Sequence, residues 1–217
     1  MENIRYAIFD MDGTLVDSMG YWLGVVDEYL ESLPPEYQLP ESVRSEIQNL
    51  GPAKATEYLK ALKDFSPEYM PNHEQSLALM RAHYEHDIEV RPGVHALLQE
   101  LKAQGVRMGI ATLTPRDLVD VCLKRHGLDD FFEFFYTSDE YPEGKREARI
   151  FLDAARHFGV PCEDIWLFED SLYSVQTAKG LGMHIAVTED EEQKAHFGTL
   201  YALSEIYFKN GFTERVK

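Results

Sequence analysis

Short apolar runs alternate with segments of helical periodicity over most of the chain. Tyr6 to Phe9 is an almost continuous apolar run, which is typical of a parallel strand buried on both faces. Alternating strands and one-sided apolar helices predict a parallel sheet with right-handed crossovers. Further strands are expected at 106–111, 131–137, 165–168 and 184–187, and helices at 92–105, 114–126, 149–158 and 171–179. Beyond Glu189 the pattern weakens to a short strand near 200–202 and a terminal helix.

The segment 17–89 departs from this alternation and predicts no strand. Apolar residues recur there at three- and four-residue spacing, as on one face of a helix, from Trp22 to Leu33. Prolines then separate further expected helices at 41–50, 53–63 and 73–87. The sequence therefore predicts an α/β fold with a Rossmann-like parallel sheet, formed by 1–16 and 90–217, and an all-helical insertion at 17–89.

Two acids follow the first expected strand directly. Asp10 and Asp12 come with Gly13 and Thr14 where the apolar run ends. In open α/β sheets, ligands bind at this carboxyl edge. Carboxylate oxygens suit a hard cation such as Mg²⁺, and one acid can attack phosphorus while the other moves a proton. An acidic turn without chemistry is the alternative for these residues alone.

Three further polar features follow later strands or lie in adjoining loops, and the sheet topology should bring all of them to one edge. They are Thr112 and Thr114, Lys145, and the segment Glu169-Asp170-Ser171. We predict a cleft for phosphoryl transfer, where catalysis is mainly positioning and charge stabilisation. Its catalytic residues are expected to be Asp10, Asp12, Thr112 and Lys145, and its Mg²⁺ ligands Asp10, Asp12, Asp170 and Glu169, the last as a ligand or an outer partner.

Each later feature also has a simpler interpretation when it stands alone. Thr112 can be a buried hydroxyl bonded to the backbone, and Lys145 a solvated surface lysine. The Glu169 segment can be an ordinary helix start with acids near the positive end of the dipole. Their joint order favours the cleft. Thr114 is then expected to open a helix as its N-cap, with backbone N–H groups directed at the phosphate.

The segment from Phe9 to Leu15 resembles the first motif of the haloacid dehalogenase superfamily, which consists mostly of phosphatases that work through an aspartyl phosphate. The resemblance extends over about 4–188. It implies that Asp12 protonates the leaving group, activates water and offers its backbone carbonyl to the metal. It also implies that 17–89 is a cap domain, as in the branch of phosphoglycolate phosphatase and β-phosphoglucomutase. The superfamily's dehalogenases do without the second acid, so a dehalogenase is not expected.

The sequence departs from this branch near two of the expected site residues. The branch usually has Lys-Pro-x-Pro-Asp where this chain has Lys145-Arg146-Glu147-Ala148-Arg149. Ser174 replaces a common glycine. The mutases usually carry a histidine where Trp22 stands, which favours hydrolysis over a phosphomutase, the first alternative; a non-catalytic phosphate-binding regulator is the second. Trp22 and Lys54 are candidate substrate contacts, although Trp22 can equally be cap core and Lys54 a solvated side chain.

Charge and composition narrow the class of partner. The net charge of −17 repels nucleic acid and anionic lipid, and no apolar run reaches the roughly 20 residues that span a bilayer. We therefore expect no nucleic-acid or membrane partner, a cytoplasmic location and a small phosphorylated metabolite as substrate. A monomer is favoured. Because the surface also repels phosphate, the site must be made locally positive by Mg²⁺ and a few bases.

Overall fold

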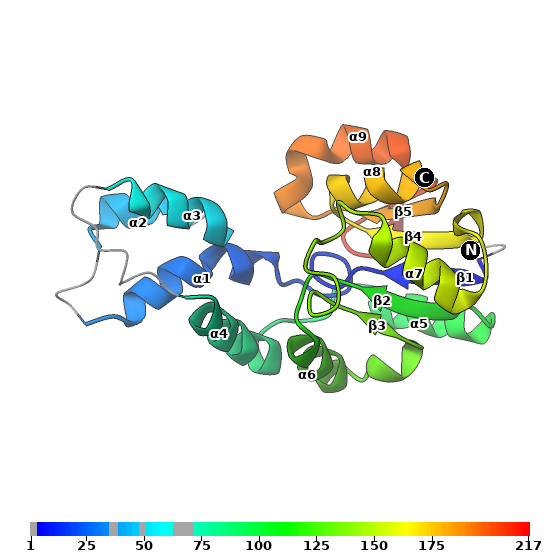
Figure 1. Ribbon diagram of the computed structural model, residues 1–217, viewed down its shortest axis with the longest axis horizontal. Helices are drawn as coiled ribbons and strands as arrows, with labels where there is room; N and C mark the ends of the chain where they lie inside the picture. The colour runs from blue at the N-terminus through cyan, green and yellow to red at the C-terminus, as the bar shows by residue number, and fades with distance from the viewer. Residues whose placement is uncertain (1–3, 35–38, 48–50, 63–71) are drawn as a thin grey trace. The chain divides into compact units, whose positions relative to one another are not determined.

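The computed structural model of the chain describes residues 4–34, 39–47, 51–62 and 72–217 (Figure 1). Contacts divide the chain into two compact units. Met1–Asp17 together with Glu89–Lys217 form the first, named the α/β unit, and Ser18–Ile88 form the second, named the helical unit. The predicted boundaries between 16 and 17 and between 89 and 90 lie one residue from these joins.

A seven-stranded sheet forms the centre of the α/β unit, in the order β3-β2-β1-β4-β5-β6-β7. The strands are β1 Tyr6–Phe9, β2 Arg107–Ala111, β3 Phe135–Tyr136, β4 Ile165–Glu169, β5 His184–Thr188, β6 Ile206–Lys209 and β7 Glu214–Arg215. Neighbouring strands run parallel except for β6 and β7. The predicted Rossmann-like α/β fold is confirmed.

Strand β1 lies between β2 and β4 in the interior of the sheet and is covered on both faces. Ala7, Ile8 and Phe9 are fully buried, which explains the continuous apolar run. On one face, α7 (Arg149–Phe158) and α8 (Leu172–Gly180) share a core with β1, β4 and β5. Helix α5 (Val94–Ala103) lies on the opposite side of the sheet from α7 in Figure 1. The carboxyl ends of β1, β2 and β4 therefore meet at one edge.

The end of the chain differs from the prediction. Residues 200–202, where a strand is expected, belong to helix α9 (Phe197–Leu203). The strand of this region is β6, which follows that helix, and β7 stands in place of the expected terminal helix. Leu200 is fully buried and its neighbour Tyr201 is 45% exposed, which fits one face of a helix. In β6, by contrast, Ile206, Tyr207 and Phe208 are buried in succession, as in a strand covered on both faces.

Two elements near the sheet edge are shorter or begin later than predicted. The third strand, expected at 131–137, is limited to the two residues of β3. Before it, residues 129–131 form a 3₁₀ turn, and the ring of Phe134 fills the space where Gly109 has no side chain. Helix α6 runs over Arg116–His126, with Pro115 and not Thr114 at the N-cap. The prediction of Thr114 as N-cap was wrong, since its hydroxyl is bonded to Asp12 instead.

The helical unit consists, among the described residues, of α1 (Met19–Ser32), α2 (Glu41–Ile47), α3 (Gly51–Lys60) and α4 (His73–His86). Its interior includes buried side chains of all four helices, among them Leu30, Ile47, Leu59 and Tyr84. The predicted ends of two helices, at 48–50 and at 63, lie outside the described residues. No helix in the described ranges is both long and apolar enough to cross a membrane.

Candidate active site

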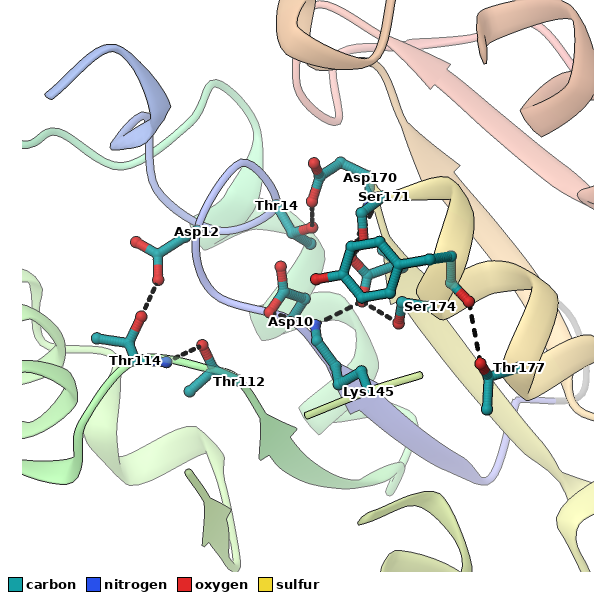
Figure 2. A network of polar contacts seen from close by, with 12 residues as sticks. Asp10, Asp12, Thr14, Thr112, Thr114, Lys145, Asp170, Ser171, Ser174 and Thr177 are labelled. Carbon is teal, nitrogen blue, oxygen red and sulfur yellow. Dashed lines mark hydrogen bonds and ion pairs between the residues drawn. The ribbon is translucent and has the colours of Figure 1, made fainter. Parts of the chain in front are cut away.

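A buried lysine holds two acids together at the carboxyl edge of the sheet (Figure 2). Asp10 follows β1 and is anchored there by its backbone N–H, which donates to the carbonyl of Phe168 on β4 (3.0 Å). The Nζ of Lys145 lies 2.6 Å from Oδ1 of Asp10 and 2.7 Å from Oε2 of Glu169. The Lys145 side chain is only 2% exposed, so the solvated-lysine interpretation is wrong.

Glu169 is the acid whose oxygens are most fully occupied. Its Oε1 accepts hydrogen bonds from the hydroxyl of Ser171 (2.7 Å) and from the backbone N–H of the same residue (3.1 Å). Its Oε2 accepts from Lys145 and from the hydroxyl of Ser174 (2.7 Å). With both oxygens bonded, Glu169 fits an outer partner of a metal better than a direct ligand.

Asp170 is positioned by the turn that follows β1. Its Oδ1 accepts a hydrogen bond from the hydroxyl of Thr14 (3.0 Å). Gly13 has a φ of +79°, and a Cβ added there would lie 2.9 Å from the Asp170 carboxyl carbon. The turn therefore requires glycine for its left-handed conformation and for its close approach to the acid. The sequence of this turn fixes the position of an acid some 156 residues further along the chain.

The second acid of the motif, Asp12, is turned toward the end of β2. Its carboxylate accepts a hydrogen bond from the hydroxyl of Thr114 (Figure 2). The buried Thr112 accepts at its Oγ1 from the backbone N–H of Thr114 (3.2 Å), which agrees with a buried hydroxyl bonded to backbone. In this arrangement Thr114 orients Asp12, and the predicted role of Thr112 toward phosphate stays a prediction.

The cluster carries more negative charge than its own residues compensate. Burial and the charge of Glu169 raise the pKa of Asp10 to about 8, although Lys145 opposes the shift. Burial, followed by the charges of Glu169 and Asp10, raises the pKa of Asp170 well above its usual range. Burial also acts to raise the pKa of Glu169, but the charge of Lys145 and the hydrogen bonds from Lys145, Ser174 and Ser171 together outweigh it and lower that pKa. Three carboxylates and one ammonium leave a net charge of −2 when all are ionised.

This charge and donor set fit a divalent cation. Asp10, Glu169 and Asp170 each offer a buried oxygen, and these oxygens lie within 4.8 Å of one another. At about 4 Å, two such charges repel by roughly 4 kcal/mol at an effective dielectric near 20. Hard oxygen donors of this kind are what Mg²⁺ prefers. The cluster can therefore hold a metal through Asp10 and Asp170, with Glu169 behind them.

Two predicted substrate contacts, Lys54 and Trp22, belong to the helical unit. Lys54 is exposed on α3. The indole N–H of Trp22, its only donor, is bonded to the hydroxyl of the buried Tyr84 on α4 (3.0 Å). This bond agrees with the alternative that Trp22 is part of the helical unit's core. The substrate contacts expected of Lys54 and Trp22 therefore stay predictions.

Sequence reasoning gave no role to Thr14, Ser171 or Ser174, although all three bond the acids. The signal for the serines was present: positions three apart on a helix share a face, and both follow Glu169 within five residues. The role of Ser171 was missed because the segment that follows Glu169 also fits an ordinary helix start. Its side chain makes no cap bond and donates to Glu169 instead.

Comparison with known proteins agrees with this geometry. Residues 7–188 match the family model described as haloacid dehalogenase-like hydrolase. The chain is 32% identical over 182 residues to a phosphoglycolate phosphatase of Pseudomonas savastanoi, covering 82% of this chain and 67% of that protein. It is 28% identical to a Drosophila melanogaster protein named "Probable pseudouridine-5'-phosphatase", covering 96% and 93%.

Solved structures show the same fold. A variant of CbbY from Rhodobacter sphaeroides, in complex with xylulose-(1,5)bisphosphate, superposes with a TM-score of 0.75 at 24% identity, covering 97% of this chain and 96% of that one. The match to the family model spans most of the chain and includes every acid of the cluster. The chain therefore belongs to the haloacid dehalogenase-like hydrolases, and the prediction that it is an enzyme of this superfamily is confirmed.

Proposed function

We propose that the chain is a Mg²⁺-dependent phosphatase that hydrolyses a small phosphorylated metabolite through an aspartyl phosphate on Asp10. The observation that carries the proposal is the pairing of Asp10 with the buried Lys145 inside an oxygen-rich cluster. The names of the relatives, which include phosphoglycolate phosphatase, support a small phosphate monoester as substrate.

In the first proposed step, a carboxylate oxygen of Asp10 attacks phosphorus and the bond to the alcohol oxygen breaks. Asp12 gives its proton to that oxygen, so the alcohol leaves neutral and the phosphoryl group is joined to Asp10. Lys145 holds the Asp10 carboxylate in place and balances charge on the phosphoryl oxygens. The hydrogen bond from Thr114 supports a role of Asp12 separate from that of Asp10.

In the second step, Asp12, now ionised, takes a proton from water as the water oxygen attacks phosphorus. The bond to Asp10 breaks, inorganic phosphate leaves, and both acids return to their starting states. Mg²⁺ held by Asp10, Asp170 and the Asp12 carbonyl would supply charge neutralisation at phosphorus. Thr112 is proposed to bond a phosphoryl oxygen. The helical unit is proposed as the cap, with Lys54 as its candidate substrate contact.

Turnover of p-nitrophenyl phosphate by the purified chain tests the proposed function directly. A panel of phosphorylated metabolites, including phosphoglycolate and sugar phosphates, then identifies the substrate by release of inorganic phosphate. Hydrolysis of at least one of these esters is expected. Phosphate binding without turnover of any of them would favour the alternative of a non-catalytic regulator.

Lys145→Ala is expected to lower kcat/KM by at least about a hundredfold, or about 2.7 kcal/mol. The reason is that Lys145 is the cation between Asp10 and Glu169, and no water can replace a buried charge at this position. Steady-state kinetics with p-nitrophenyl phosphate measure the effect, and Lys124→Ala, at an exposed lysine of α6, offers the comparison. An effect no larger than that of Lys124→Ala would assign the role to another residue.

Water, and not a second sugar, is expected to take the phosphoryl group from Asp10. A phosphomutase needs a proton-exchanging group in its cap, and Trp22 cannot exchange a proton near neutral pH. Its indole N–H is also already bonded to Tyr84. Phosphorus NMR with β-glucose 1-phosphate, a trace of the 1,6-bisphosphate and other sugar phosphates should show inorganic phosphate from each ester that reacts. Conversion to an isomeric phosphate instead would establish the mutase.

A further inference from the structure

Helix α8 holds the segment around Lys145, where the superfamily branch usually has two prolines. The guanidinium of Arg146 lies over the ring of Tyr173 on α8, 4.5 Å from the ring centroid. The hydroxyl of Thr177, one turn further on the same helix, donates to the carbonyl of Tyr173 (3.0 Å), and the carbonyl of Arg146 is a second, longer acceptor at 3.4 Å. The main chain next to Lys145 is thus fixed by contacts with α8 rather than by prolines.

The same helix contributes a direct bond to the acid that shares Lys145. Ser174 is fully buried on α8, and its hydroxyl donates to Oε2 of Glu169, the oxygen that also accepts from Lys145 (Figure 2). A glycine, which the branch commonly has here, offers no donor. Ser174 and Lys145 are therefore two donors on one carboxylate oxygen, both at 2.7 Å.

This shared oxygen affects how Lys145 divides its attraction between two acids. Asp10 and Glu169 accept from the same ammonium at 2.6 and 2.7 Å. The Ser174 hydroxyl is a second donor to Oε2 of Glu169 and satisfies part of the negative charge of that carboxylate. More of the ammonium's attraction is then left for Asp10. Without the Ser174 hydroxyl, Lys145 would be the only side-chain donor to this oxygen among the described residues, and its ammonium would be drawn toward Glu169.

We propose that Ser174 is a positioning residue, which acts through Glu169 to keep Lys145 on the reacting carboxylate of Asp10. The inference rests on the proposed function, because it concerns how Lys145 serves Asp10. Ser174 touches neither Asp10 nor the phosphate in this assignment. Ser174 and the contacts of Arg146 with α8 together place Lys145, as the prolines do elsewhere in the branch.

The test combines Ser174→Ala with Lys145→Ala. Ser174→Ala alone is expected to lower kcat for p-nitrophenyl phosphate by about tenfold, as is typical of an outer partner of a reacting group. In the Lys145→Ala background the same change should cause no further loss, because its effect passes through Lys145. Ser204→Ala is the matched control: Ser204 is also buried, and its hydroxyl donates to the carbonyl of Tyr201 at the end of α9.

A second measurement does not need turnover. In nitrogen NMR of metal-free protein with ¹⁵N-labelled lysine, the Nζ resonance of Lys145 should be displaced in Ser174→Ala, because the ammonium is drawn toward Glu169, and unmoved in Ser204→Ala. Ser174→Gly serves as the second variant if the alanine variant does not fold. Equal losses of kcat in both backgrounds, or no loss at all, would overturn the proposal. If the wild type hydrolyses no ester, the proposed function fails, while the Nζ resonance still decides whether Ser174 positions Lys145.

Discussion

Asp10→Asn is expected to lower kcat below about a thousandth of the wild-type value, a loss of about 4 kcal/mol or more in transition-state stabilisation. The change is nearly isosteric, but an amide is a poor nucleophile and a poorer metal ligand than a carboxylate. Asp10 is the proposed nucleophile, and its carboxylate lies 2.6 Å from the Nζ of Lys145. Single-turnover and steady-state kinetics with p-nitrophenyl phosphate measure the loss.

The fold of this variant should survive, and the direction of its stability change can be derived. The folded-state pKa of Asp10 is raised from 3.8 to about 8 by burial, then by Glu169. An acid with a raised folded pKa destabilises the fold above its unfolded pKa, and the penalty grows until the pH passes the folded value. Asparagine carries no such penalty. Without metal at pH 8, Asp10→Asn should therefore unfold at the same temperature as the wild type or higher.

Asp130→Asn is the matched control, since Asp130 is exposed on the 3₁₀ turn before β3 and lies outside the acid cluster. It should leave both kcat and the unfolding temperature unchanged. If Asp10→Asn kept more than about a tenth of the wild-type kcat, a loss below 1.4 kcal/mol, Asp10 would not be the nucleophile. A lower unfolding temperature would assign the loss to the fold instead.

The strands that are buried on both faces of the sheet were predictable from the sequence. β1, β2, β4 and β5 are nearly continuous apolar runs, and a parallel strand covered on both faces cannot be built otherwise. The edges of the sheet were less predictable. At one edge, Phe134 is apolar because its ring packs at Gly109, not because it belongs to a longer strand. Near the other, the apolar residues of 200–202 belong to the helix α9.

The site was predictable as a set of strand ends, because a parallel sheet brings those ends to one edge. The bonds inside the set were not. Nothing in the sequence shows that Thr114 bonds Asp12, or that Ser174 bonds Glu169 and not the backbone. Such contacts depend on side-chain directions across elements that are far apart in the chain. The altered segment after Lys145 is the clearest case, since Arg146 and Ala148 stand where the branch has rigid prolines, and the contacts of Arg146 with α8 are visible only in the structure.

Removal of divalent metal is expected to abolish turnover, and Mg²⁺ should restore it. When ionised, the three acids of the cluster and Lys145 carry a net charge of −2 at this edge of the sheet, which would repel a phosphate ester. Ca²⁺ should bind without restoring activity, because it takes more ligands at longer distances and would misplace Asp10 relative to phosphorus. Full activity after exhaustive chelation, with the metal content checked, would contradict the requirement.

The same cation should stabilise the fold, and more so at pH 8 than at pH 6. Metal binds the ionised acids, while the raised pKa values of Asp10 and Asp170 mean that protons compete for them as the pH falls. At a concentration a hundred times its Kd, Mg²⁺ should contribute about 2.7 kcal/mol and raise the unfolding temperature by roughly 5–10 °C. Thermal unfolding with and without Mg²⁺ measures the shift, and Asp170→Asn, which lacks one proposed ligand, should greatly reduce it. A shift of equal size in that variant would mean that Mg²⁺ binds elsewhere on this acidic chain.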